Sequence, residues 1–264
     1  MGPVALGLAL AAALLFAGPA LMQERLLYFP ARVSVAQASA GGLQPWPDAQ
    51  DFRGLLARAE GVPRGTAIVF HGNAGHAGDR GFYAQALTPL GLRVILAEYP
   101  GYGPRGGKLG EASLVDDAAR SIELAHAQFG APLLVVGESL GAGVAAAAAE
   151  RQRAQVAGLL LITPWNTLAD VAAFHYPWLP VRRLLRDRYD SVAHLQHVDA
   201  PVAVVLAEHD DIVPARLGQA LHDALPGRKQ RVLLPGAGHN DWPATTDAHW
   251  WQQRIDFLLG APPS

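Results

Sequence analysis

The sequence predicts an α/β fold in which a mostly parallel central sheet carries helices on both faces. Short apolar runs, such as residues 133–136 and 202–207, are typical of strands that are buried on both faces. These runs alternate with segments of roughly 10–18 residues that have helical spacing of apolar side chains. The chain has 264 residues, half of them apolar, which is enough for one large α/β domain with an ample core.

Strands and helices alternate along most of the chain. We expect strands at residues 66–70, 92–98, 133–136, 156–162, 202–207 and 230–234. We expect helices at residues 81–90, 111–129, 216–225 and 245–259, and one that follows the strand at 133–136 and ends near Glu150. Residues 23–30 look like a short tether into the first strand, and 33–64 are rich in turn residues with one possible strand at 52–58. No linker divides residues 25–264, so we expect one domain there.

The N-terminal residues 1–24 form a separate hydrophobic segment. No charged side chain occurs from Gly2 to Gln23, and about twenty apolar residues are enough to span a bilayer as a helix. We expect a membrane anchor, in a bacterial cell membrane, on a side that two following arginines are too few to settle. A cleaved signal peptide, which would make the protein secreted or periplasmic, and a buried soluble helix are the alternatives.

Composition excludes several function classes. The net charge is −2 and there is no long Lys/Arg run, so we expect no nucleic-acid partner. The absence of cysteine excludes disulfides, thiolate zinc sites and a cysteine nucleophile. No His/carboxylate spacing indicates a metal. Residues 101–106 match a dinucleotide motif by letter, but Pro104 removes a backbone donor and the next helix opens only near Glu111, so we expect no cofactor.

Residues 137–141 have the pattern G-x-S-x-G between a predicted strand and a predicted helix. In a nucleophile elbow this pattern forms a sharp turn that lifts the serine above the sheet. Side chains at Gly137 and Gly141 would crowd such a turn. The alternative is an ordinary serine in a strand-to-helix turn, because the motif alone is common by chance.

Polar residues at other strand ends fit one mechanism with this serine. Asp210 follows the strand at 202–207, and His239 follows the last strand. A serine hydroxyl needs a base, and an imidazole needs an acceptor that fixes its tautomer. The order Ser139, Asp210, His239 is that of the α/β-hydrolase fold. The backbone N–H groups of Leu140 and Asn73 would then face the developing oxyanion.

The sequence resembles serine hydrolases of the α/β-hydrolase superfamily, in particular the small-lid, N-terminally anchored branch of bacterial hydrolases and eukaryotic depalmitoylases. Five motifs in the right order carry the resemblance: His71-Gly-Asn-Ala-Gly75, Glu98-Tyr-Pro-Gly-Tyr-Gly103, Gly137-Glu-Ser-Leu-Gly141, Ala207-Glu-His-Asp-Asp-Ile-Val-Pro214 and Gly236-Ala-Gly-His-Asn-Asp241. The resemblance implies an α/β-hydrolase fold with Ser139 as nucleophile, Asp210 as acid and His239 as base. Asp211 is the alternative acid, although the spacing to Val213-Pro214 favours Asp210.

The family also places a lid after the strand at 156–162, here at about residues 164–199. Pro177 and Pro180 exclude a long helix there, so we expect one or two short helices. The stretch contains Trp165, Phe174, Tyr176 and Trp178, which either form an apolar wall for an acyl group or only pack the lid. We expect Tyr102, Trp165 and Trp242 to line a substrate pocket.

These features predict a serine hydrolase that cleaves a carboxylic ester or thioester through an acyl-enzyme. Its partners would be a small-molecule or acyl-chain ester and, through residues 1–24, a membrane. A peptidase or amidase with the same triad is the first alternative, and a non-catalytic binding protein on the same scaffold is the second. The oligomeric state and the chain length of the acyl group stay open.

Overall fold

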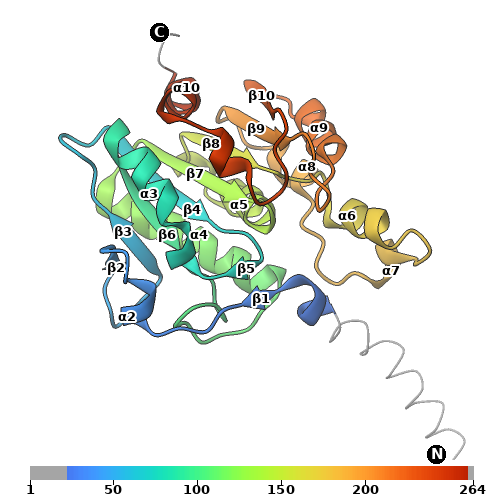
Figure 1. The fold of residues 1–264 in the computed structure, drawn as a ribbon, viewed down its shortest axis with the longest axis horizontal. Coiled ribbons are helices and arrows are strands. Elements are labelled where there is room, and N and C mark those ends of the chain that lie inside the picture. Colours follow the sequence, from blue (N-terminus) through green and yellow to red (C-terminus); the bar gives the residue numbers. More distant parts are fainter. Residues whose placement is uncertain (1–22, 261–264) are drawn as a thin grey trace, which may run out of the picture.

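A computed structural model describes residues 23–260 and contains an eight-stranded sheet with helices on both faces (Figure 1). The order across the sheet is β10-β9-β8-β7-β4-β6-β3-β2. The six strands from β10 to β6 are parallel, and β3 and β2 are antiparallel to their neighbours. Their bounds are β2 Gln44–Trp46, β3 Gly54–Ala57, β4 Gly65–Phe70, β6 Leu92–Ala97, β7 Leu133–Glu138, β8 Gly158–Ile162, β9 Val202–Ala207 and β10 Lys229–Leu234. The predicted fold class is confirmed.

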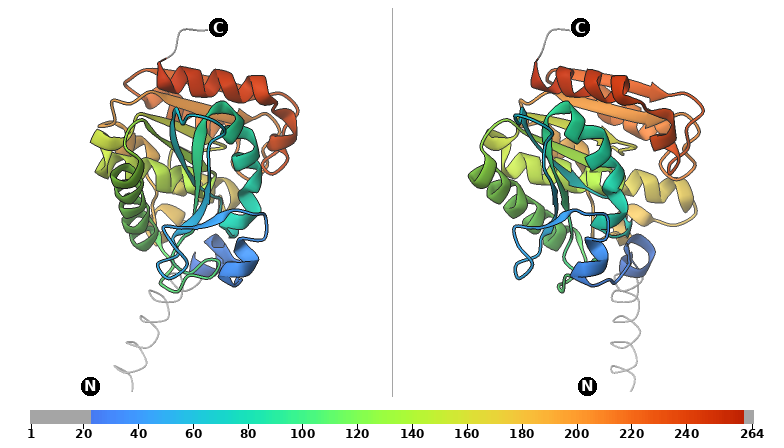
Figure 2. Two further views of the ribbon diagram at one scale, coloured as in Figure 1. Left: turned by 90° about the vertical axis from the view of Figure 1, so that its left-hand side faces the viewer. Right: turned by 60° about the vertical axis from the view of Figure 1, so that its left-hand side comes forward.

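The helices divide between the two faces of the sheet, as both views of Figure 2 show. Side chains of α4, α5, α8 and α9 pack on one face, and those of α3 and α10 on the other. The helices are α2 Val35–Ala38, α3 Gly81–Leu87, α4 Glu111–Phe129, α5 Leu140–Arg151, α6 Leu168–His175, α7 Val181–Leu184, α8 Ser191–Leu195, α9 Ala215–Ala224 and α10 Ala248–Leu259.

Successive residues of the central strands enter different cores. In β7, Leu133 and Val135 pack with α4 and α5, whereas Leu134 and Val136 pack with α3 and α10. The central strands β4, β7, β8 and β9 are therefore buried on both faces, which explains their unbroken apolar runs in the sequence. The alanines of α5 are buried too, because short side chains let this helix lie close to the sheet.

The chain changes direction across the sheet between β4 and β7. It runs from β4 outward to β6 and then returns through α4 to β7, on the other side of β4. In open α/β sheets, ligands bind outside the carboxyl ends of the strands at such a switch point. The loop after β4 and the turn after β7 meet there.

Most predicted elements agree with the structure within one or two residues, but residues 33–64 contain more structure than expected. Besides β3, which replaces the possible strand at 52–58, they form the short α2 and the edge strand β2. These elements have three or four residues, too few for a periodic pattern. The tether also differs: residues 23–27 are helical, and β1 Phe29–Pro30 pairs with β5 Ala74–Gly75.

Residues 164–199 contain three short helices, α6, α7 and α8, one more than expected. The third helix is capped by Asp190, whose side chain accepts the N–H of Ala193 at 3.0 Å. The membrane anchor was expected at residues 1–24, of which residues 1–22 lie outside the described part of the chain. Between residues 23 and 260 no helix combines the length and the apolar character needed to cross a bilayer.

Candidate active site

Ser139 occupies a strained turn between β7 and α5. Its φ and ψ are 54° and −116°, a region that a residue with a side chain rarely adopts. The start of α5 lies so close to the end of β4 that only glycine fits at position 141, because a Cβ there would lie 2.0 Å from the carbonyl oxygen of Phe70. The Ser139 N–H donates to the carbonyl of Ile162 at 2.9 Å, which ties the turn to β8. This backbone is what the G-x-S-x-G motif predicts.

Ser139, His239 and Asp210 form one chain of hydrogen bonds. The Ser139 Oγ and His239 Nε2 atoms are 2.9 Å apart, and His239 Nδ1 donates to Asp210 Oδ2 at 2.7 Å. The three residues come from the ends of β7, β10 and β9, separated by up to 100 positions in sequence. An imidazole placed between a hydroxyl and a carboxylate can take the hydroxyl proton while the carboxylate holds its tautomer.

The acid loop after β9 fixes the orientation of Asp210. Its other oxygen, Oδ1, accepts the N–H groups of Ile212 at 3.0 Å and Val213 at 2.6 Å. The carboxylate therefore keeps one oxygen for the loop and one for His239, and its side chain is 1% exposed. The neighbouring Asp211 is exposed. Of the two adjacent aspartates, it is Asp210 that the structure places against His239.

The histidine loop is held by its own contacts. Asp241 Oδ1 accepts the N–H of Gly238 at 2.6 Å, so this carboxylate shapes the loop and does not reach the imidazole. The N–H of His209 donates to the carbonyl of Ala237 at 2.8 Å, which connects the histidine loop to the acid loop. The His209 side chain is exposed. An open depression lies beside His239 and is lined by His209, Asp211, Gly236, Gly238, His239, Asn240 and Asp241.

The loop after β4 lies against the elbow. A Cβ built on Gly72 would be 3.7 Å from the Cβ of Ser139, so the backbone that leads into Asn73 runs close to the serine. Leu140 is the first residue of α5, and its N–H has no partner within the helix. The two expected oxyanion donors therefore sit on segments that flank Ser139, and their role stays a prediction.

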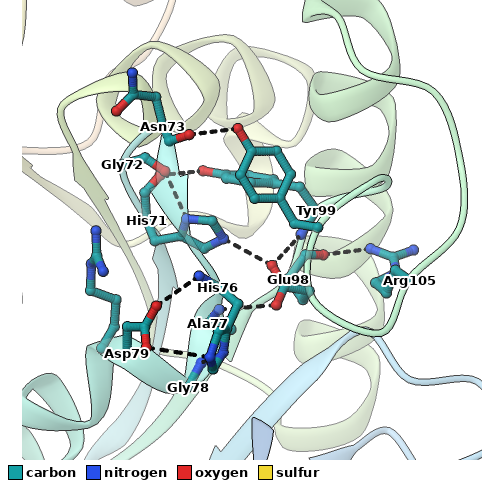
Figure 3. Close-up of polar contacts among 12 residues, drawn as sticks. His71, Gly72, Asn73, His76, Ala77, Gly78, Asp79, Glu98, Tyr99 and Arg105 are labelled. Atoms are coloured by element: carbon teal, nitrogen blue, oxygen red, sulfur yellow. Dashed lines mark hydrogen bonds and ion pairs between the residues drawn. The ribbon is translucent and has the colours of Figure 1, made fainter. Parts of the chain in front are cut away.

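A second buried histidine–carboxylate pair supports this loop (Figure 3). His71 Nε2 is 3.0 Å from Glu98 Oε1, and both side chains are buried. Glu98 also accepts the N–H groups of Ala77 at 3.0 Å and Tyr99 at 3.2 Å. The other ring nitrogen of His71, Nδ1, faces the carbonyl of Gly72 at 2.7 Å. Both nitrogens of His71 thus face oxygen atoms of the scaffold.

Two tyrosines also hold the loop after β4 in place. Tyr99 donates its hydroxyl to the carbonyl of His71, and Tyr102 donates to the carbonyl of Asn73, each at 2.8 Å. Burial raises the pKa of both phenols above the ordinary value, so both remain protonated donors. From the sequence we expected a turn at residues 98–103 with Tyr102 in a substrate pocket, and the role of Glu98 was missed. A carboxylate directly after an apolar strand was the available signal.

The three residues expected to line a substrate pocket are buried in the two cores. Tyr102 and Trp165 belong to the core of α4 and α5, and Trp242 to that of α3 and α10. Trp165 donates its Nε1–H to the carbonyl of Tyr189 at 3.2 Å, and Trp242 packs against Tyr83 and Trp251. Packing thus accounts for these contacts, and their expected role in a pocket stays a prediction. Within residues 23–260 no three histidine or carboxylate side chains converge as a metal-binding group.

Comparisons with known proteins agree with this architecture. Residues 61–185 match the family described as serine aminopeptidase, S33. An uncharacterised protein of Mycobacterium tuberculosis is 40% identical over 229 residues, which cover 83% of this chain and 81% of that protein. A lysophosphatidylserine lipase of Danio rerio is 30% identical over 176 residues, which cover 59% of this chain and 46% of the lipase.

Solved structures share the fold at lower sequence identity. A monoacylglycerol lipase of Paleococcus ferrophilus superposes with a TM-score of 0.59 at 21% identity, covering 78% of this chain and 98% of its own. Est1E of Butyrivibrio proteoclasticus, solved with ferulic acid, gives a TM-score of 0.61 at 16% identity, covering 78% of this chain and 96% of its own. With its sheet order, its elbow and these relatives, the chain belongs to the α/β-hydrolase superfamily.

Proposed function

We propose that this protein is a serine hydrolase that cleaves carboxylic esters or thioesters through an acyl-enzyme. The observation that carries the proposal is the chain of hydrogen bonds from Ser139 through His239 to Asp210, with distances of 2.9 and 2.7 Å. These distances lie in the range in which a base can take a proton from its nucleophile. The strained backbone at Ser139 supports the same role.

The reaction would have two similar halves. Ser139 Oγ attacks the carbonyl carbon while His239 Nε2 accepts the hydroxyl proton, and the N–H groups of Leu140 and Asn73 stabilise the oxyanion. Collapse of the intermediate breaks the bond to the leaving alcohol or thiol, which receives the proton from His239. Water then attacks the acyl-serine, again giving a proton to His239, and the carboxylic acid leaves as Ser139 regains its hydrogen.

The names of the relatives support an ester as substrate without fixing its chain length. A monoacylglycerol lipase and a lysophosphatidylserine lipase both have names that denote cleavage of lipid esters. The family description names an aminopeptidase instead, so an amide or peptide substrate is the alternative. Both bond types use the same triad chemistry and differ in the leaving group that His239 must protonate.

The test is hydrolysis of p-nitrophenyl esters from acetate to palmitate, with Ser139→Ala as the matched control. We expect turnover that Ser139→Ala abolishes. An optimum at short acyl chains would indicate a small-molecule carboxylesterase, and an optimum at long chains a lipid or acyl-protein substrate. Aminoacyl p-nitroanilides in parallel test the peptidase alternative. Equal ester turnover by Ser139→Ala and the parent protein would contradict the proposal.

A further inference from the structure

The lid exposes a group of large apolar side chains that the catalytic proposal does not use. Trp178 is 76% exposed, and Phe174, Tyr176 and Leu184 are each about 40% exposed. They lie at the end of α6, in the turn that follows it and at the end of α7, so they are close in sequence. We call these four residues the lid patch. Because α6 and α7 pack against each other, these side chains are exposed on one part of the surface, and such an apolar area is typical of an interaction site.

Cationic side chains accompany the lid patch. Arg182 and Arg183 lie in α7 directly before Leu184, and both are exposed. Arg182 contacts Asp170 of α6, while Arg188 follows as a further exposed arginine. Tryptophan and tyrosine are enriched at the level of lipid headgroups, and arginine is attracted to anionic headgroups. This mixture is typical of a surface that rests on a membrane.

The lid is joined to the residues at which the uncharged N-terminal segment ends. Gln23 Oε1 accepts the N–H of Arg186 at 2.8 Å, and Glu24 pairs with the Arg186 guanidinium at 3.0 Å. Tyr28 donates its hydroxyl to the buried Asp187 at 2.7 Å. Residues 23–28 therefore contact the segment that follows α7, and Figure 1 shows both on the same side of the molecule. The twenty-one residues from Gly2 to Met22 carry no charge and lead into this point.

We propose that the lid patch is a docking surface for a lipid bilayer that contains anionic headgroups. Trp178, Tyr176, Phe174 and Leu184 enter the interface, and Arg182 and Arg183 contact the headgroups. The proposal is independent of the hydrolytic chemistry, because none of these side chains contacts Ser139, His239 or Asp210 among the described residues. A protein partner or a second copy of the chain would be a different occupant.

Docking would bring the acid loop close to the membrane. His175, at the end of α6, donates its Nε2–H to the carbonyl of Ile212 at 2.8 Å, and the Ile212 N–H donates to Asp210. Ile212 is itself an exposed apolar residue, and Phe174 stacks on the Arg216 guanidinium at the start of α9. Two hydrogen bonds thus separate the lid helix from the carboxylate of the triad.

The absence of cysteine allows one fluorescent label at a chosen position. The full chain with Trp178→Cys would carry an environment-sensitive dye and be reconstituted into phosphatidylcholine vesicles with and without phosphatidylglycerol. The control is Val62→Cys. Val62 is 89% exposed and lies before β4, at the strand end opposite to the lid. Both variants would also be made with Ser139→Ala, which separates docking from hydrolysis.

We expect the emission of the label at position 178 to shift to the blue when vesicles are added. A lipid with a nitroxide in its headgroup should quench roughly half of this emission, because interfacial side chains reach the depth of the headgroups. The label at 62 should not change. Arg182→Glu with Arg183→Glu should reduce quenching at 178 on anionic vesicles only. Equal quenching at both positions, or no quenching at 178, would overturn the proposal. A shift at 178 that depends on protein concentration without vesicles would assign the patch to a second copy.

Discussion

The His239–Asp210 and His71–Glu98 pairs both lie at strand ends, and they differ in the group that the second ring nitrogen contacts. In the His239–Asp210 pair, Nε2 faces the Ser139 hydroxyl at 2.9 Å. In the His71–Glu98 pair, Nδ1 faces the carbonyl of Gly72 at 2.7 Å. The first imidazole has a partner that can give it a proton, and the second has only acceptors. The same two groups therefore form a base in one place and a structural tie in the other.

The two carboxylates also differ in the groups that their oxygen atoms bind. Asp210 uses one oxygen for two amide N–H groups of its own loop and leaves the other for His239. Glu98 divides its oxygens between His71, Ala77 and Tyr99, so it connects the loop after β4 to the turn after β6. Loss of Asp210 should therefore reduce catalysis, and loss of Glu98 should mainly reduce stability.

Replacement of His239 should have the largest effect on the rate. His239→Ala removes the proton acceptor of Ser139, and we expect kcat to fall about 10⁵- to 10⁶-fold, as for a triad histidine. The protein should stay folded, because Asp210 Oδ1 keeps both amide N–H donors of its own loop. Steady-state ester kinetics with a thermal melt checks this. A loss of only a few fold would assign the base elsewhere.

Asp210→Asn should reduce kcat about 10⁴-fold, because the amide would no longer hold His239 in the tautomer that accepts the serine proton. The matched control is Asp211→Asn, which changes the exposed neighbour. We expect the control to keep its rate within about twofold, as exposed charges contribute little. If Asp211→Asn showed the larger loss, the acid would have to be reassigned.

These two predictions concern residues that can be identified from the sequence, because of the strands that they follow. Ser139 and Asp210 follow β7 and β9, which are recognisable because their apolar side chains are buried on both faces, and His239 follows the more polar edge strand β10. The order of the parallel strands then brings their carboxyl ends to one edge. The position of Glu98 directly after an apolar strand was a signal for a polar role, but its partner could not be predicted, because His71 lies 27 positions away and has no distinctive spacing.

The long helices and the buried strands of the fold were predictable from the sequence, and the short elements were not. The helix predicted at 111–129 and the strand predicted at 202–207 agree with α4 and β9 at both ends. The helix has apolar residues at helical spacing over its whole length, and the strand is a continuous apolar run. β2 was missed because three residues with Pro45 in an edge strand carry no alternation. The expectation of one or two helices in the lid was wrong, because Asp190 caps a third helix, α8, that the spacing of apolar side chains did not indicate.

Glu98→Gln should affect stability more than catalysis. One amide hydrogen would point at a donor, which leaves part of the buried network unsatisfied, so we expect a loss of about 3 kcal/mol in the free energy of unfolding. The control is Glu123→Gln, because Glu123 forms an exposed pair with Arg120. It should change the stability by less than about 0.5 kcal/mol.

Chemical denaturation measures both glutamate variants. Displacement of the loop that carries Asn73 should also lower kcat, by up to about 100-fold if the backbone moves by an ångström. A Glu98→Gln protein as stable as the Glu123→Gln control would contradict the structural role that we assign to this pair.

Tyr102→Phe should have the smallest effect. It removes only the hydrogen bond from the phenol to the carbonyl of Asn73 and leaves the ring in the core. We expect a loss of about 1 to 2 kcal/mol in stability, with a decrease in kcat of less than about tenfold. Denaturation and ester kinetics on the same preparation test both. A loss of rate as large as that of Asp210→Asn would indicate direct contact of Tyr102 with the substrate.

The central claim is that Ser139 is the nucleophile. The most direct measurement is reaction with a fluorophosphonate, followed by digestion and mass spectrometry of the labelled peptide. We expect a single adduct on Ser139, a much slower reaction in His239→Ala and none in Ser139→Ala. An adduct on another serine, or undiminished labelling of Ser139→Ala, would contradict it.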